Sequence, residues 1–155
     1  MKPFLLVAIL SVLPCSLIAA PTSSEVVQSF IQAYNKHDVG LMVSHTTDDV
    51  TWMRITGKKV AVQTSTKAEF GAAMTDYFES LKGASATFLN IIGSGSYVST
   101  VERVTWDNDG EELSQCSIGT FRVKAGKIAE LWYFPAHACD ELILKVETKP
   151  EVVVL

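Results

Sequence analysis

The chain has 155 residues, a length that suits one domain. Hydrophobic residues make up 48% of it and charged residues 19%, and the net charge is −4. This balance excludes a disordered chain, which is poorer in apolar residues, and a polybasic nucleic-acid binder, which needs clustered lysine and arginine for its phosphate contacts.

Residues 1–20 predict a secretory signal peptide. Lys2 supplies the positive charge, residues 4–13 form an apolar run, and the small residues Ala19 and Ala20 offer two cleavage sites. The run is shorter than the roughly 20 apolar residues of a membrane-spanning helix. Removal of the segment takes away one positive charge, which changes the net charge from −4 to −5. We therefore expect a secreted or periplasmic protein whose mature form has no membrane segment.

Residues 21–155 are predicted to form the single mature domain, and they keep two cysteines, Cys116 and Cys139. In an oxidising compartment such a pair is a disulfide candidate. Two buried free thiols are an equally good interpretation, because free cysteine behaves as a small hydrophobic residue. The sequence leaves both alternatives open.

The first half of the domain has the apolar spacing of helices. Residues 26–34 form one helical stripe, and Ser23 or Ser24 is the candidate N-cap. A short second helix follows a cap at Asp38. A third begins after Thr66, where a glutamate three residues later completes a capping box.

The second half changes to a period of two, which is typical of strands. A strand is also expected between the second and third helices. Three helices followed by a run of hairpins predict an α+β fold, with the helices on one face of a curved antiparallel sheet and a cone open at one end. The expected strands are 50–55, 86–92, 97–106, 113–123 and 127–134.

Three segments carry a resemblance to a known family. They are FIQAYNKHD at 30–38, TDDVTW at 47–52 and GTFRVKAGKI at 119–128. In this order and at these distances they resemble the NTF2-like superfamily, close to its SnoaL-like and ketosteroid-isomerase-like branches, over roughly residues 24–140. The resemblance implies a cone around a pocket that hosts isomerases, cyclases, dehydratases and plain binding proteins, so it implies a fold and no single activity.

The resemblance also assigns three isomerase positions, and the sequence departs from all of them. The general base falls on Arg54, the oxyanion-binding tyrosine on Phe30 and the neutral acid on Gly119. A guanidinium cannot act as a base near neutral pH, and Phe and Gly have no side-chain donor. We therefore expect no ketosteroid isomerase activity by that mechanism.

The strand pattern predicts which side chains face the pocket. The final hairpin is expected to pair Gly119 with Leu131, and the preceding one to pair Trp106 near Leu113, so alternation places Glu102 on the inner face. The result is an aromatic-lined pocket for a small hydrophobic or acidic organic ligand. Its expected ligand-binding residues are Phe30, Tyr34, Trp52, Arg54, Met74, Ser117 and Tyr133.

Two charged side chains of this pocket have two interpretations each. Arg54 is an anchor for a carboxylate or enolate, or a structural ion-pair partner of Glu102 or Asp49. Glu102 is a displaced general base, or a solvated residue if the register slips by one.

His137 and Asp140 follow the last strand near the expected mouth of the cone. They form either an acid–base dyad or a surface histidine beside a capping aspartate. With His45 and Cys139 they are also the only pool of metal ligands, and their spacing matches no known site, so we expect neither a metal nor a cofactor.

The outer face of the sheet is expected to carry Ile118, Thr120, Trp132 and Phe134, which predicts a homodimer. Three functional hypotheses follow. The first is an exported binding protein whose Arg54 anchors the ligand. The second is a SnoaL-like lyase, cyclase or isomerase that transfers protons through Glu102 or His137, and the third is a dimeric interaction module without catalysis.

Overall fold

The computed structural model describes residues 19–139. Asp140 and all but the last two residues of the expected signal peptide lie outside this range. None of the helices within it has the length and apolar character needed to span a bilayer.

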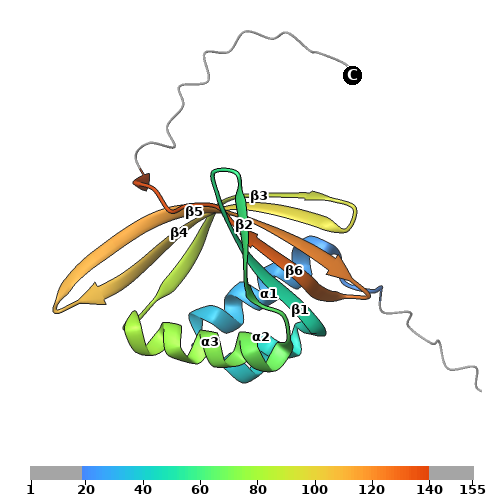
Figure 1. Cartoon of the computed structure of the whole chain (residues 1–155), viewed down its shortest axis with the longest axis horizontal. Coiled ribbons are helices and arrows are strands. Elements are labelled where there is room, and N and C mark those ends of the chain that lie inside the picture. Colours follow the sequence, from blue (N-terminus) through green and yellow to red (C-terminus); the bar gives the residue numbers. More distant parts are fainter. Residues whose placement is uncertain (1–18, 140–155) are drawn as a thin grey trace, which may run out of the picture.

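Three helices lie on one side of a curved six-stranded sheet (Figure 1). The expected α+β class is confirmed, and the helices cover the concave face of the sheet. The elements in chain order are α1 (Ser23–Asn35), α2 (Val39–Ser44), β1 (Thr46–Thr56), β2 (Lys59–Thr64), α3 (Lys67–Ser80), β3 (Ser85–Ser94), β4 (Tyr97–Asn108), β5 (Glu111–Lys124) and β6 (Lys127–Tyr133).

Side-chain caps start the two longer helices, and α1 has a complete capping box whereas the box expected for α3 is not formed. The N-cap of α1 is Thr22, one residue before the two serines that the sequence suggested. Its hydroxyl accepts from the Glu25 backbone N–H (3.2 Å), and the Glu25 carboxylate accepts from the Thr22 N–H (2.7 Å). The N-cap of α3 is Thr66, as expected, although the Glu69 carboxylate accepts from the N–H of Ser65 rather than of Thr66. Each cap of this kind contributes about 1 kcal/mol.

The sheet is mixed, whereas the sequence predicted an antiparallel one. Its strand order is β2-β1-β6-β5-β4-β3, and β6 runs parallel to β1 while all other neighbours are antiparallel. Helix α3 carries the chain from β2 to the opposite edge of the sheet, where β3 lies. The meander from β3 to β6 then returns toward β1 and places β6 beside it. This crossover sets the parallel direction, and it is not visible in local periodicity.

Strand β2 is not among the strands that the sequence predicts. It forms an antiparallel hairpin with β1 through pairs such as Arg54 with Ala61. It is an edge strand, and Val60 and Val62 are 61% and 56% exposed. A short strand with little burial has a weak alternation signal.

The final hairpin has a register two residues away from the expected one, because Gly119 pairs with Tyr133 rather than with Leu131. The turn has two residues, Ala125 (φ 50°) and Gly126 (φ 72°), and both have positive φ. The pairing register of β5 with β6 also shifts between Arg122 and Val123, just before the turn. Because the shift is even, the side chains keep their faces. The expected pairing of Trp106 with Leu113 is confirmed.

An aromatic cluster joins the helices to the sheet. Phe30 of α1 lies 6.0 Å from Phe70 of α3 and 6.2 Å from Phe121 of β5, measured between ring centroids. All three side chains are at most 2% exposed. Burial of each contributes about 1.5–3 kcal/mol before entropy is counted, so this cluster fixes the helices above the concave face.

Candidate functional site

A cavity of about 450 Å³ lies between the helices and the concave face of the sheet. Its walls combine an apolar lining with a small number of polar groups, as in sites for small organic molecules. The apolar lining includes Phe30, Ile31, Met42, Trp52, Phe70, Met74, Val104 and Leu131. The polar groups come from Tyr34, Arg54, Thr56, Tyr77, Glu102, Gln115, Ser117 and Tyr133.

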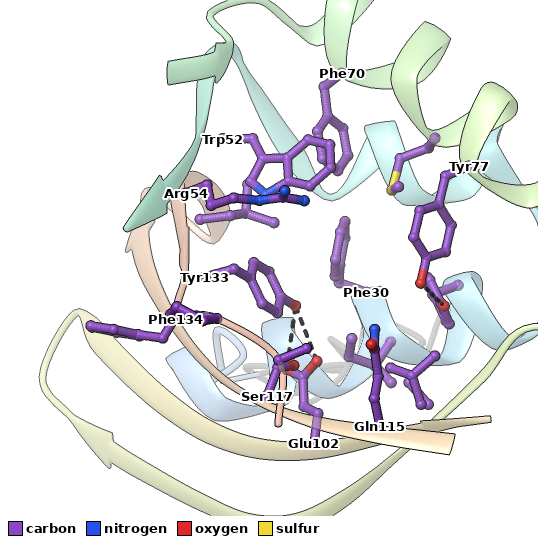
Figure 2. A pocket seen from close by; sticks show the side chains of 18 of the residues that line it. Phe30, Trp52, Arg54, Phe70, Tyr77, Glu102, Gln115, Ser117, Tyr133 and Phe134 are labelled. Atoms are coloured by element: carbon purple, nitrogen blue, oxygen red, sulfur yellow. Dashed lines mark hydrogen bonds between the residues drawn. The ribbon is translucent and has the colours of Figure 1, made fainter. Parts of the chain in front are cut away.

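The carboxyl group of Glu102 lies beside Ser117 and Tyr133 in the wall of the cavity (Figure 2). It projects inward from β4, opposite Ser117 of β5, and is only 2% exposed. The Thr100 hydroxyl donates to its Oε1 (2.6 Å), and the Tyr133 hydroxyl donates to its Oε2 (3.1 Å). The alternative of a solvated glutamate on the outer face is therefore wrong.

Burial raises the pKa of the Glu102 carboxyl above its ordinary value, and the hydrogen bonds from Thr100 and Tyr133 offset part of that rise. No salt bridge between described residues reaches this carboxyl. Burial likewise raises the pKa of the Tyr133 hydroxyl, with the nearby Glu102 charge as the next cause, so this tyrosine stays neutral. The pair combines a readily protonated carboxyl with a neutral hydroxyl.

Gly119 makes room for this arrangement. A Cβ at this position would lie 2.9 Å from the Thr100 Oγ1, 3.2 Å from the Glu102 Oε1 and 3.2 Å from the Tyr133 Cε1. Position 119, to which the resemblance assigns a neutral acid, therefore carries no side chain. A carboxyl from the neighbouring strand β4 lies in the adjacent space instead.

A second polar group of the cavity is formed by two tyrosines. The Tyr34 hydroxyl of α1 donates to the Tyr77 hydroxyl oxygen of α3 (3.2 Å), and burial raises the pKa of both. Figure 2 shows Gln115 of β5 pointing into the cavity below them. Tyr77 and Gln115 were not among the expected site residues. The apolar stripe of α3 already contained Tyr77, and alternation from Ser117 would have found Gln115.

Arg54 and Trp52 lie on another side of the cavity, both on β1 (Figure 2). Arg54 is exposed and pairs across the backbone with Tyr133. Among the described residues it forms no salt bridge, so the expected ion pair with Glu102 or Asp49 is absent. The Trp52 indole packs edge-on against Phe70 at 6.2 Å, and its buried Nε1 has no partner in the described part of the chain.

His137 does not join this site. Its ring is absent from the cavity lining, and its Nδ1 lies 3.5 Å from the Pro135 carbonyl oxygen. Asp140 lies outside the described residues, so the dyad with His137 stays a prediction. Within residues 19–139 no cluster of three or more metal-ligating side chains occurs.

The two cysteines form a disulfide that joins Cys116 of β5 to Cys139. This settles the choice between a disulfide and two free thiols. The link forms because the chain after β6 continues along β5, where His137 pairs with Cys116.

Comparison with known proteins identifies the architecture. The sequence model of the SnoaL-like domain matches residues 27–131, and no curated protein sequence matches the chain. An uncharacterized cystatin fold protein from Novosphingobium aromaticivorans superposes with a TM-score of 0.63 at 22% identity, covering 74% of this chain and 99% of that one. An M. tuberculosis LEH-like epoxide hydrolase gives 0.61 at 15%, covering 72% and 80%. AclR, a putative hydroxylase from Streptomyces galilaeus, gives 0.60 at 14%, covering 74% and 88%. Identities this low show a shared fold alone.

Proposed function

The chain belongs to the SnoaL-like family of the NTF2-like fold, and from this we propose that its cavity binds a small, largely apolar organic molecule and exchanges a proton with it through Glu102. The reaction class is that of a lyase, cyclase or isomerase. A carboxyl removes a proton from carbon next to a carbonyl, or returns one, while the apolar walls exclude water.

The environment of Glu102 carries this proposal. A buried carboxyl that accepts hydrogen bonds from two hydroxyls, without a cation among the described residues beside it, is costly for folding. Such groups occur preferentially at functional sites. Burial raises the pKa of Glu102 above its ordinary value, which favours the protonated form that a general acid needs.

Tyr133 supports the same role. Its hydroxyl donates to the Glu102 carboxylate, so it stabilises the charged form after the carboxyl has given up its proton. The Glu102 and Tyr133 oxygens both face the cavity, where the ligand would lie.

We further propose that Arg54 anchors an acidic or enolisable end of the ligand. Its forked donors suit a carboxylate, and its exposed position on β1 with no acidic partner in the described chain leaves them available to a ligand. This feature also favours a second candidate function, a binding protein without turnover in which Glu102 is a hydrogen-bond donor. Export and assembly as a homodimer remain proposals as well, and Ile118, which is 38% exposed, supports an interface on the outer face. Phe134, which was expected on that face, lines the cavity instead.

Native mass spectrometry of the purified protein would show a retained ligand, which then serves as the substrate candidate. We expect Glu102→Gln to lower its turnover by roughly 100-fold or more while the ligand still binds. We expect Arg54→Ala to weaken binding by about 10-fold or more. Matched controls are Glu111→Gln and Arg103→Ala, whose side chains are exposed and do not line the cavity. Full turnover by Glu102→Gln would reject the proton-transfer role, and unchanged binding by Arg54→Ala would reject the anchor.

A further inference from the structure

The chain after β6 continues along β5 as a separate segment, residues 134–139, which we call the mouth segment. The Phe134 N–H donates to the Ile118 carbonyl (3.0 Å), and Cys116 and His137 exchange two backbone hydrogen bonds of 2.9 Å each. Pro135, between them, has no N–H to donate. Three backbone hydrogen bonds and the disulfide therefore attach this segment to β5.

The mouth segment forms part of the cavity wall. Phe134, Pro135 and Ala136 line the cavity although all three are exposed, so little buried apolar surface holds them in place. Figure 2 shows Phe134 next to Tyr133 at the side of the cavity. Residues with few buried contacts have low local stability, so the covalent link matters more here than it would in the core.

The other end of the link lies on the neighbouring strand β5. Cys116 is fully buried on β5, between Gln115 and Ser117, whose side chains line the cavity. The disulfide thus joins the strand that carries two cavity residues to the segment that carries three more. Neither cysteine lines the cavity, so a change in this bond acts on the cavity through the mouth segment that the bond holds.

We propose that the Cys116–Cys139 disulfide is a redox-sensitive clamp on the cavity. When oxidised it holds the mouth segment against β5, and its reduction by a dithiol releases the segment and speeds ligand exchange. This inference goes beyond the proposed function. Of its two tests, only the ligand measurement rests on the proposed function.

The chemistry is thiol–disulfide exchange. Cys139 is partly exposed and Cys116 is not, so the dithiol thiolate attacks the Cys139 Sγ, and Cys116 leaves as a thiolate that takes up a proton. The second thiol of the reductant then attacks the mixed disulfide and frees Cys139. Two electrons pass to the protein, which gains two thiols, and the dithiol becomes a disulfide.

Hydrogen–deuterium exchange tests the clamp without any ligand. We expect dithiothreitol to speed exchange at the His137 and Cys116 amides by roughly 100-fold, which corresponds to the usual contribution of a disulfide, while amides within α1 stay protected. The variant Cys139→Ser should exchange fast with or without reductant. Unchanged exchange at both amides on reduction would overturn the clamp.

The dissociation rate of an apolar anionic dye, 1-anilinonaphthalene-8-sulfonate, tests the effect on the cavity. We expect it to rise by roughly 10-fold or more on reduction and in Cys139→Ser. The control Ile128→Ala removes a fully buried side chain that does not line the cavity, so it lowers the melting temperature without freeing the mouth segment, and its dissociation rate should not change. A rise in Ile128→Ala equal to that in Cys139→Ser would overturn the gating. Failure of the dye to bind the oxidised protein would count against the proposed function. The hydrogen–deuterium exchange measurement would then still show whether the disulfide holds the mouth segment against β5.

Discussion

The buried carboxyl of Glu102 predicts a specific pH dependence of stability. Its pKa is raised in the folded protein above the ordinary 4.5, which it regains on unfolding. The folded state therefore holds more protons than the unfolded state between these two values. The free energy of unfolding must fall as the pH rises through this window, by up to about 1.4 kcal/mol per pH unit, until the carboxyl ionises in the folded protein.

The variant Glu102→Gln removes this titration and keeps the shape of the side chain. At pH 5 we expect it to be less stable than the wild type by about 1 kcal/mol, because an amide disturbs the hydrogen bonds from Thr100 and Tyr133. As the pH rises through the window, the difference should move in favour of the variant by up to about 1.4 kcal/mol per pH unit.

Urea denaturation at pH 5, 6, 7 and 8, with the disulfide kept intact, measures this difference. The exposed Glu111→Gln serves as the control, since its carboxylate is not buried by folding, and its difference from the wild type should not change with pH. A difference between Glu102→Gln and the wild type that stays constant from pH 5 to pH 8 would show that burial does not hold a proton on Glu102, and the argument for proton transfer would fail.

Four further predictions address the fold, the interface and export. Gly119→Ala should cost about 1–3 kcal/mol in urea denaturation, because its Cβ would meet a hydroxyl on β4 at 2.9 Å. Phe121→Ala should cost about 3–5 kcal/mol by the same assay, and a smaller loss would mean that the aromatic cluster is not the main link between helices and sheet. Light scattering should show a homodimer that Ile118→Glu converts to monomers, whereas a dimer that survives this change would exclude the outer face as the interface. The intact mass of the exported protein should correspond to a chain that begins at Ala20 or Pro21, and a mass that still contains Lys2 would contradict the signal peptide.

The sequence predicted the faces of the strands better than their partners. Alternation alone placed Glu102, Ser117 and Tyr133 inward, and it survived a register error because the error was an even number of residues. The two-residue turn at Ala125 and Gly126 and the irregularity between Arg122 and Val123 together caused that error, and alanine gives no sign of the turn that it forms here.

Contacts between distant segments account for the rest. The hydrogen bond from Tyr133 to Glu102 spans 31 residues, and the space above Gly119 depends on side chains from two other strands, β4 and β6. No local pattern encodes such proximity. The ion pair between Arg54 and Glu102 does not form for the same reason. The Glu102 carboxyl accepts hydrogen bonds from the hydroxyls of Thr100 and Tyr133 instead.

The central place of β6 has a consequence for the order in which the protein can assemble. This strand lies between β1 and β5, so it alone connects the hairpin built from residues 46–64 to the meander built from residues 85–124. It is also the last strand within residues 19–139. Until a ribosome has released it, the two halves of the sheet have no shared edge, and the cavity between them lacks its middle wall. Pairing across so long a stretch of sequence is slow, so the nascent chain has an extended period without its final structure.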